Sequence, residues 1–577
     1  MSNLIKKFKK FLYNKNILSF ILALIVYISL YLQNYISNIN SISLLLLLML
    51  IIFFKNLNLY NKKFFKSCCV FSFIFSFLTI FGEIVYINLF EQNDSVWKYI
   101  FTFKTVFSFL GLYILIYAIL NTILPALYNY NIKKQSFLKP LSIFISAFFI
   151  ILICWLPYLL VKFPGNLNID SFVCLDMILN NFSYINNHHS IFYIMFIAYQ
   201  LMIGMSIFNN INLAIAFYTI VQMLILDLIF SYFIYFLAKK NINKNIIIIS
   251  ILYFALLPIH GFSSISMWKD VLFSGIILLI CIQLSKIVES LNFKDFVLLN
   301  IYLLLMIFVR NNGIYIYFIL FIIMLVILKK YIKIIIPSFL LICTIYYGVT
   351  IFVFDKLNIE KVKLAEYIGI PIQQIGRMAY KKINFDSSDE KLLIKVMGSI
   401  DNLKNSYNPE YSDEIKFSKY YNESELFANK KDYFNMWIKL SLKHPDIALE
   451  SYAVSTLGYW YPGIDYVNVN NIIQENNYGI KATPLLNKKI QTFIIKLSTN
   501  DIPLINLFWN TCLPFWVTSL FCYLCIKKRG LKFVLPYIPI FGIWLTLMIA
   551  TPAIAEFRYI YASYTCLPLL IILPFEK

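Results

Sequence analysis

The sequence predicts an all-α polytopic integral membrane protein. Of its 577 residues, 60% are hydrophobic and only 14% are charged, whereas soluble domains contain roughly 45–50% apolar and about 25% charged residues. The hydrophobic residues form runs of about 17–25, the length of a helix that crosses a ~30 Å hydrocarbon core. A backbone in lipid must satisfy its own hydrogen bonds, and these runs are too uniformly apolar for the alternating strands of a membrane barrel.

The apolar runs predict about 14 transmembrane helices, plus an interfacial or re-entrant segment on the outer face. The helices are expected at residues 17–33, 41–54, 67–87, 99–120, 141–161, 212–238, 246–259, 271–288, 296–310, 313–328, 334–354, 503–526, 533–550 and 559–574. The apolar run 190–207 is the expected interfacial or re-entrant helix, because a crossing there would export every later basic loop.

The net charge of +21 lies in short loops between the apolar runs, so it does not indicate nucleic-acid binding. Lysine clusters such as those near 239–244, 329–333 and 527–532 fall on one side of the predicted topology. Cytoplasmic loops are rich in Lys and Arg. We therefore expect a multi-pass protein of the cell membrane with both termini in the cytoplasm, and an uncleaved first helix after the basic N-terminus.

Four regions follow from this pattern. Residues 1–140 form an N-terminal four-helix membrane region, and 141–354 form a membrane core whose outer loops carry unusual polar residues. Residues 355–500 are predicted to be a mainly helical extracytoplasmic segment, in which 359–380 reads as an amphipathic interfacial helix. Residues 501–577 supply the closing membrane helices.

The first outer loop of the core contains Asp170, His188 and His189. A partly desolvated carboxylate at position 170 could accept a proton from an attacking hydroxyl; it could equally cap the helix that follows. The two histidines are adjacent, so they cannot form an i, i+4 metal pair. One of them could bind a substrate phosphate or hydroxyl, or both could be interfacial polar residues.

Three further outer loops carry charged pairs or single cations. Lys269 could meet an anionic head group with Asp270 orienting it, although Lys beside Trp is also typical of a membrane-interface anchor. Arg310 suits bidentate phosphate binding or snorkelling. Glu556 and Arg558 begin the last span as a structural pair, or as a pair that presents the arginine to a phosphate.

The segment 355–500 adds three candidate substrate-binding residues. Gln374 and Arg377 lie on the expected interfacial helix, and Trp460 lies in an aromatic cluster suited to stacking on sugar rings. Within the spans, Asp227 has no evident partner. Most of the ten cysteines lie in apolar runs and are interpreted as small packing residues.

The order of these motifs along the chain resembles the GT-C superfamily of membrane glycosyltransferases, in a poorly characterised bacterial branch. The resemblance covers about 141–577 and is carried by PGNLNIDSF, NNHHS, MWKD, RNNG, PIQQIGR and AEFRY. It implies a transfer of sugar from a polyprenyl-phosphate donor to a glycan or lipid acceptor at the outer face, within the lipid bilayer.

The resemblance also implies roles for individual residues. Asp170 would be the catalytic base, and Arg310 and Arg558, with Lys269, would hold the donor phosphate. Many members pair the loop acid with a second adjacent acid, but here Ser171 follows. A lone-base mechanism is therefore the simpler choice. No cofactor is expected; a divalent metal is possible but has no second adjacent acid to support it.

Two other functions fit parts of the sequence. A transporter or lipid flippase would need polar residues along a path through the membrane, for which Asp227 is the main candidate. A non-catalytic membrane scaffold would use the outer segment to bind wall polymers. Exchange of Asp170 for Asn separates the three, because only the enzyme depends on that carboxylate for turnover.

Overall fold

The computed structural model describes residues 15–36, 38, 40–57, 61–91, 95–135, 139–360, 362–464, 472–499, 502–551 and 553–576. Over these residues the chain is helical, and pairing between extended segments is confined to four isolated bridges. Ten helices are long and apolar enough to cross a membrane, or eleven if the bent pair 244–256 and 258–264 is one span. The protein is therefore a multi-pass helical membrane protein.

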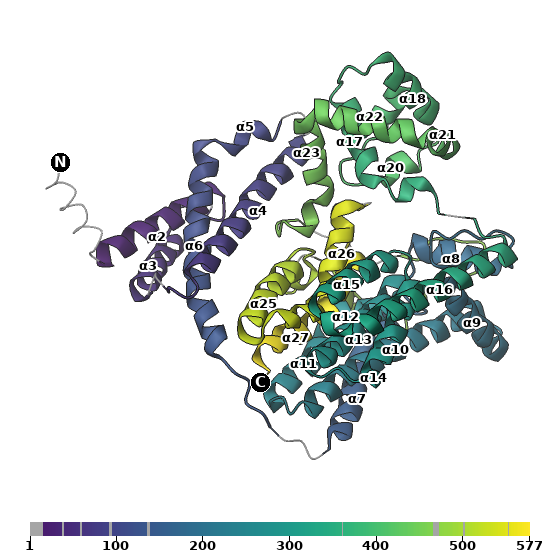
Figure 1. The fold of residues 1–577 in the computed structure, drawn as a ribbon, viewed down its shortest axis with the longest axis horizontal. Helices are drawn as coiled ribbons and strands as arrows, with labels where there is room; N and C mark the ends of the chain where they lie inside the picture. Colours follow the sequence, from purple (N-terminus) through teal and green to yellow (C-terminus); the bar gives the residue numbers. More distant parts are fainter. Residues whose placement is uncertain are drawn as a thin grey trace.

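The N-terminal helices form a group of their own, seen at the left of Figure 1. They are α2 (Lys15–Leu32), α3 (Ser41–Asn56), α4 (Phe65–Glu91), α5 (Trp97–Ile100) and α6 (Phe103–Asn129). Helix α6 packs against α2 and α4, and α2 packs against α3. The basic residues before position 15 lie outside the described residues.

The core of the molecule is a bundle around α13 (Lys269–Glu289), which packs against α10, α14 and α27. The share of buried residues is 83% in α13 but only 11% in the 329–357 helical stretch, so α13 is central and 329–357 is peripheral. The other bundle helices are α7 (Pro140–Val161), α8 (Ile169–Leu179), α9 (Ile191–Phe208), α10 (Ile211–Lys239), α11 (Lys244–Leu256), α12 (Pro258–Ser264), α14 (Phe293–Val309), α15 (Gly313–Ile327), α16 (Ile332–Leu357), α25 (Leu513–Arg529), α26 (Ile538–Ile549) and α27 (Phe557–Ile572).

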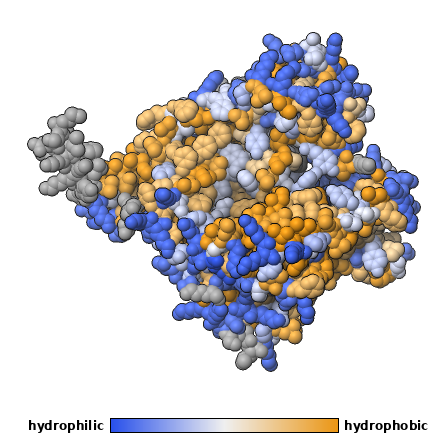
Figure 2. All heavy atoms as spheres, viewed as in Figure 1, coloured by the Kyte–Doolittle hydropathy of each residue, from blue (hydrophilic) through white to orange (hydrophobic). Residues whose placement is uncertain are grey.

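Residues 355–500, here called the polar segment, have a hydrophobic core of their own. Their helices are α17 (Gly369–Tyr380), α18 (Ser387–Met397), α19 (Ile400–Asn405), α20 (Asp413–Lys416), α21 (Glu423–Ala428), α22 (Lys430–Lys443), α23 (Pro445–Thr456) and α24 (Lys488–Lys496). Figure 1 shows α17 to α22 gathered beside one end of the bundle. In Figure 2, hydrophilic residues cover this segment, while hydrophobic residues dominate the middle of the same face.

Several predicted helices differ from the observed ones; α6, expected to end near residue 120, continues to Asn129. The helix expected at 359–380 begins at Gly369, and its residues 369–379 are buried, so α17 lies inside the polar segment instead of presenting one face to a membrane. The helix expected at 503–526 begins only at Leu513, because the side chain of Asn510 accepts hydrogen bonds from the backbone N–H groups of Cys512 and Leu513, and Pro514 follows. Segment 190–207 is a continuous helix, α9, of spanning length; whether it crosses is still a prediction.

The two ends of the bundle differ in chemistry. At the Glu289 end of α13, Glu289 forms ion pairs with Lys240 and Arg529, and Glu576 lies 3.3 Å from Arg529. At the Lys269 end lie the residues singled out in the outer loops. A helix of 21 residues separates these ends by roughly 30 Å. The basic loops and the candidate site thus occupy opposite ends of the same helix.

Candidate functional site

The residues that the loops supply converge at the Lys269 end of α13. We call them the charged cluster: Asp170, His188, His189, Lys269, Asp270, Arg310, Glu556 and Arg558. They come from loops up to 388 residues apart in sequence.

Asp170 lies in the first turn of α8 but is not the cap of that helix. The side chain of Asn168 caps α8 and forms a capping box with Ser171. Ser171 also donates to the carbonyl of Met267, 3.0 Å away, which ties this turn to the loop before α13. Asp170 is therefore free of a capping role, and its carboxylate accepts a hydrogen bond from Arg558 Nη1.

Arg558 lies in the first turn of α27 and is the central cation of the cluster. Besides Asp170, its Nη2 donates to Tyr559 Oη at 3.2 Å, and its Nε lies 3.5 Å from Glu556 Oε1. The guanidinium carbon is 5.9 Å from the ring of Trp268. Arginine offers five donors in a fixed fork, so the pair with Asp170 leaves donors for a second anion.

Lys269 and His189 form a second contact beside Asp170. Lys269 Nζ lies 3.1 Å from His189 Nδ1 and 3.4 Å from the carbonyl oxygen of His188. His189 Nε2 is 3.9 Å from Asp170 Oδ1, too far for a hydrogen bond. Burial, reinforced by nearby Lys269 and His188, lowers the pKa of His189, which keeps its ring neutral.

Arg310, a candidate phosphate ligand, lies in an ion pair with Asp270. Its Nη1 lies 2.9 Å from Oδ1 of Asp270, which is buried. Its guanidinium also lies 5.1 Å from the ring of Phe273 and 5.2 Å from that of Tyr559. Cations over aromatic faces are held by the ring quadrupole. The Tyr559 ring thus contacts both arginines, since the Arg558 guanidinium lies 5.0 Å from it.

The polar segment reaches the charged cluster through Glu366 and Lys416, which sequence reasoning did not select. Glu366 Oε1 lies 4.0 Å from His188 Nδ1, and Glu366 Oε2 lies 3.3 Å from Lys416 Nζ. Lys416 also pairs with Asp413 at 2.6 Å. Backbone bonds join Asn187 to Glu360, 3.0 Å apart, so the histidine loop and the polar segment are fixed to each other.

Three predicted site residues lie elsewhere. Arg377 Nη2 is 2.8 Å from Glu450 Oε2, a buried pair that joins α17 to α23. The side chain of Gln374 donates to Ala448 O at 2.9 Å, in the same interface. Trp460 stacks on Phe81 of α4, with ring centroids 5.9 Å apart. All three side chains are buried in structural contacts.

The neighbour of Trp460 reaches the site loop instead. Tyr459 is fully buried. Its hydroxyl accepts a hydrogen bond from the backbone N–H of Glu556 at 3.3 Å and donates one to the carbonyl of Ala553 at 3.0 Å. The aromatic residues 459–461 before Pro462 indicated such a contact. Hydropathy alone does not tell which of their rings faces the loop that contains Glu556.

Burial raises the pKa of Glu556 to about 8, with further contributions from Asp270 and Asp413. Between the ordinary value of 4.5 and about 8, the folded chain holds a proton that the unfolded chain releases. Stability therefore falls as pH rises through this window. We expect the thermal unfolding temperature of the wild type to drop between about pH 4.5 and 8 more steeply than that of E556Q, whose side chain does not titrate. Parallel curves would contradict this assignment.

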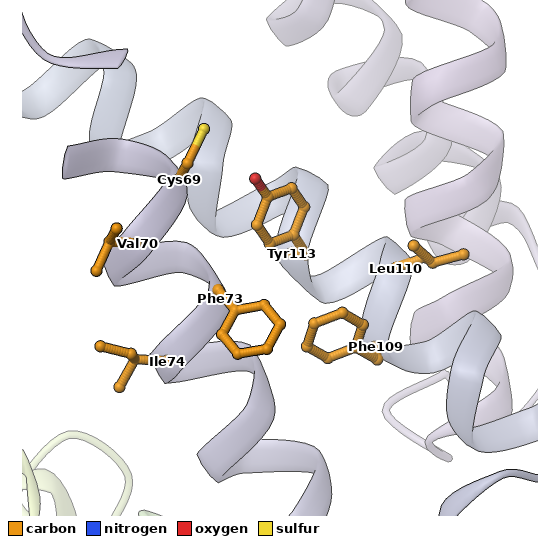
Figure 3. A pocket seen from close by; sticks show the side chains of 7 residues that line it. All are labelled: Cys69, Val70, Phe73, Ile74, Phe109, Leu110 and Tyr113. Carbon is orange, nitrogen blue, oxygen red and sulfur yellow. The ribbon is translucent and has the colours of Figure 1, made fainter. Parts of the chain in front are cut away.

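A groove between two N-terminal helices has an apolar lining, unlike the charged cluster. It has a volume of about 410 Å³ between α4 and α6 and is lined by Cys69, Val70, Phe73, Ile74, Phe109, Leu110 and Tyr113 (Figure 3). This lining suits hydrocarbon and carries no charge. The described residues contain no group of three or more His, Cys, Asp or Glu placed to hold a metal ion.

Fold and site together define a multi-pass helical membrane protein with a charged cluster at one end of its bundle. The chain belongs to a family of unknown function, DUF6020, whose model matches residues 173–576. The match includes the cluster from His188 to Arg558 and begins three residues after Asp170. No curated protein and no solved structure matches the chain.

Proposed function

We propose that the chain is a membrane glycosyltransferase of the GT-C type, which moves a sugar from a polyprenyl-phosphate donor to an acceptor at the outer face of the membrane. One observation carries the proposal. The carboxylate of Asp170 on α8 accepts a hydrogen bond from the guanidinium of Arg558 on α27. The imidazole of His189 and the ammonium of Lys269 lie beside this pair. A carboxylate that can act as a base and a cation that can bind phosphate, side by side, are what the proposed transfer requires.

The reaction is a single displacement. The acceptor hydroxyl attacks the anomeric carbon of the sugar, the bond from that carbon to the phosphate oxygen breaks, and Asp170 takes the hydroxyl proton. Polyprenyl phosphate leaves with the bonding electron pair, and Arg558 stabilises its added charge. Because the donor phosphate competes with Asp170 for Arg558, its arrival releases the carboxylate toward the acceptor.

The proposed sidedness rests on the two ends of α13. The basic loops at its Glu289 end mark that end as cytoplasmic by the positive-inside rule. The charged cluster, roughly 30 Å away, then lies at the outer leaflet. A polyprenyl donor keeps its chain in lipid and its sugar at that surface, and the polar segment lies beside the cluster to receive the acceptor.

Sugar transfer tests the proposal directly. Wild-type protein in nanodiscs is mixed with polyprenyl-monophosphate hexoses and with an acceptor fraction from cell envelopes, and released polyprenyl phosphate is measured. We expect release from at least one donor, dependent on the acceptor.

The control variant for this assay is D227N, which removes a buried carboxylate outside the charged cluster. Asp227 is buried within α10 and accepts a hydrogen bond from Ser231, and no residue of the charged cluster pairs with it among the described residues. We expect D227N, if folded, to keep its transfer activity. Absence of release from every donor, or lipid transport that depends on Asp227 without sugar transfer, would contradict the proposal.

A further inference from the structure

Three nitrogen donors around the Asp170–Arg558 pair have no hydrogen-bond acceptor among the described residues. They are His189 Nε2, Trp268 Nε1 and Arg558 Nε. His189 is 3% exposed and Trp268 is 6% exposed, so bulk water does not satisfy them. Buried donors are rarely left unpaired in native structures, and each such group calls for a reason.

The donors come from separate elements that meet here. His189 lies in the loop before α9, Trp268 immediately precedes α13, and Arg558 begins α27. His189 Nε2 is 3.9 Å from Asp170 Oδ1, and the Trp268 ring lies 5.9 Å from the Arg558 guanidinium carbon. The three donors therefore belong to side chains that lie next to Asp170 or Arg558.

The contact with Lys269 decides which nitrogen of His189 carries the proton. With Lys269 charged, its ammonium has three donors and no acceptor, and His189 Nδ1, 3.1 Å from Lys269 Nζ, then accepts. In the neutral ring the proton then lies on Nε2, the nitrogen that faces Asp170. Lys269 has its second donation to His188 O, which fixes the ammonium in place.

We infer that His189 Nε2–H and Trp268 Nε1–H, together with Arg558 Nε–H, bind the oxygens of a phosphate group at the Asp170–Arg558 pair, and that Lys269 is a positioning residue that acts through His189. This rests on the proposed function for the identity of the phosphate as that of the lipid-linked donor. The proposal adds Trp268 to the site. In it, Lys269 does not contact the phosphate but determines which nitrogen of His189 carries the proton.

Nuclear magnetic resonance of the imidazole nitrogens tests the role of Lys269. The chain has only four histidines, so ¹⁵N-histidine labelling in nanodiscs gives few signals, which single His→Gln variants assign. We expect His189 to be protonated at Nε2 and bare at Nδ1 at neutral pH. In K269M we expect a mixture of tautomers, and in K269R the wild-type tautomer.

His260 is the matched control, because it is buried and its Nδ1 lies 3.0 Å from Tyr561 Oη, away from Lys269. Its signals should be the same in wild type, K269M and K269R. A proton on Nδ1 of His189 in the wild type, or an unchanged His189 in folded K269M, would overturn the role of Lys269. The wild-type measurement decides the tautomer even if K269M fails to fold.

Phosphate binding tests the donor set. Dimethyl phosphate, a phosphodiester without a lipid chain, is titrated into protein labelled at histidine and tryptophan nitrogens. We expect the His189 Nε2–H and Trp268 Nε1–H signals to shift together and His260 to stay unchanged. In W268F, which keeps the aromatic packing but lacks the donor, affinity should fall by roughly tenfold, the effect of one hydrogen bond to a charged group.

Unshifted His189 and Trp268 signals, or equal affinities of W268F and wild type, would overturn the donor set. Neither experiment requires sugar transfer. Transfer without these shifts would therefore refute the phosphate contacts alone, whereas the shifts without transfer by any donor would refute the proposed reaction and leave an anion-binding site.

Discussion

Replacement of Asp170 by asparagine is expected to slow sugar transfer by about 10²–10⁴-fold, the usual contribution of a positioned general base. Asparagine keeps the size of the side chain and can still meet the Arg558 guanidinium through its carbonyl oxygen. The fold should therefore survive. Binding of a polyprenyl monophosphate should be maintained, since the neutral amide competes less well than a carboxylate for Arg558.

Two variants control for this result. D176N changes another acid of α8, whose carboxylate accepts hydrogen bonds from Tyr478 and Asn180 instead of from the charged cluster. Sugar transfer by D176N should be little changed. R558Q should lose both donor binding and transfer, because it removes the cation that holds the phosphate. Full activity in D170N would exclude a base role for Asp170, and unchanged donor binding in R558Q would exclude the phosphate role of Arg558.

Replacement of Arg310 by methionine is expected to destabilise the protein by about 3–5 kcal/mol, the range for breaking one side of a buried ion pair. The carboxylate of Asp270, 3% exposed as a side chain, would lose its partner at 2.9 Å. The cost arises from the unpaired buried charge and not from lost attraction alone. Thermal unfolding in detergent micelles measures the effect.

The double variant R310M/D270N separates charge from packing. Removal of both charges leaves no unpaired ion, so most of the lost stability should return. A single R310M variant as stable as the wild type, or a double variant no more stable than R310M, would contradict a structural ion pair. Arg310 would then be available for the phosphate role that the sequence first indicated.

Hydropathy and charge were sufficient to predict most helices, because the cost of exposing a polar backbone in lipid leaves few alternatives. The helices at 41–56, 140–161, 269–289 and 313–327 begin and end within a few residues of their expected positions. Helix α17 differs because its polar residues are satisfied inside the polar segment: Gln374 by Ala448 and Arg377 by Glu450. Such partners are invisible in a hydropathy pattern.

Sequence reasoning placed Asp170, Lys269, Arg310 and Arg558 on one side of the membrane, and the structure brings them to one end of the bundle. Sequence reasoning could not predict which of these charged side chains form ion pairs with each other. The engagement of Arg310 by Asp270, of Lys269 by His189 and of Glu366 by Lys416 depends on side-chain packing between distant loops. Charge type and loop position predict where ions gather, but not which of them neutralise each other.

The outer location of the charged cluster is the claim on which the proposed reaction depends, and cysteine labelling in intact cells tests it most directly. Ser183 is exposed in the loop between α8 and His188, and Asn245 is exposed at the opposite end of the bundle beside Lys244. The ten native cysteines are buried or lie in apolar helices, so the wild type gives the background.

We expect a membrane-impermeant maleimide to label S183C in intact cells and N245C only after the membrane is permeabilised. Labelling of N245C without labelling of S183C in intact cells would place Asp170 and Arg558 on the cytoplasmic side. That result would contradict sugar transfer at the outer face.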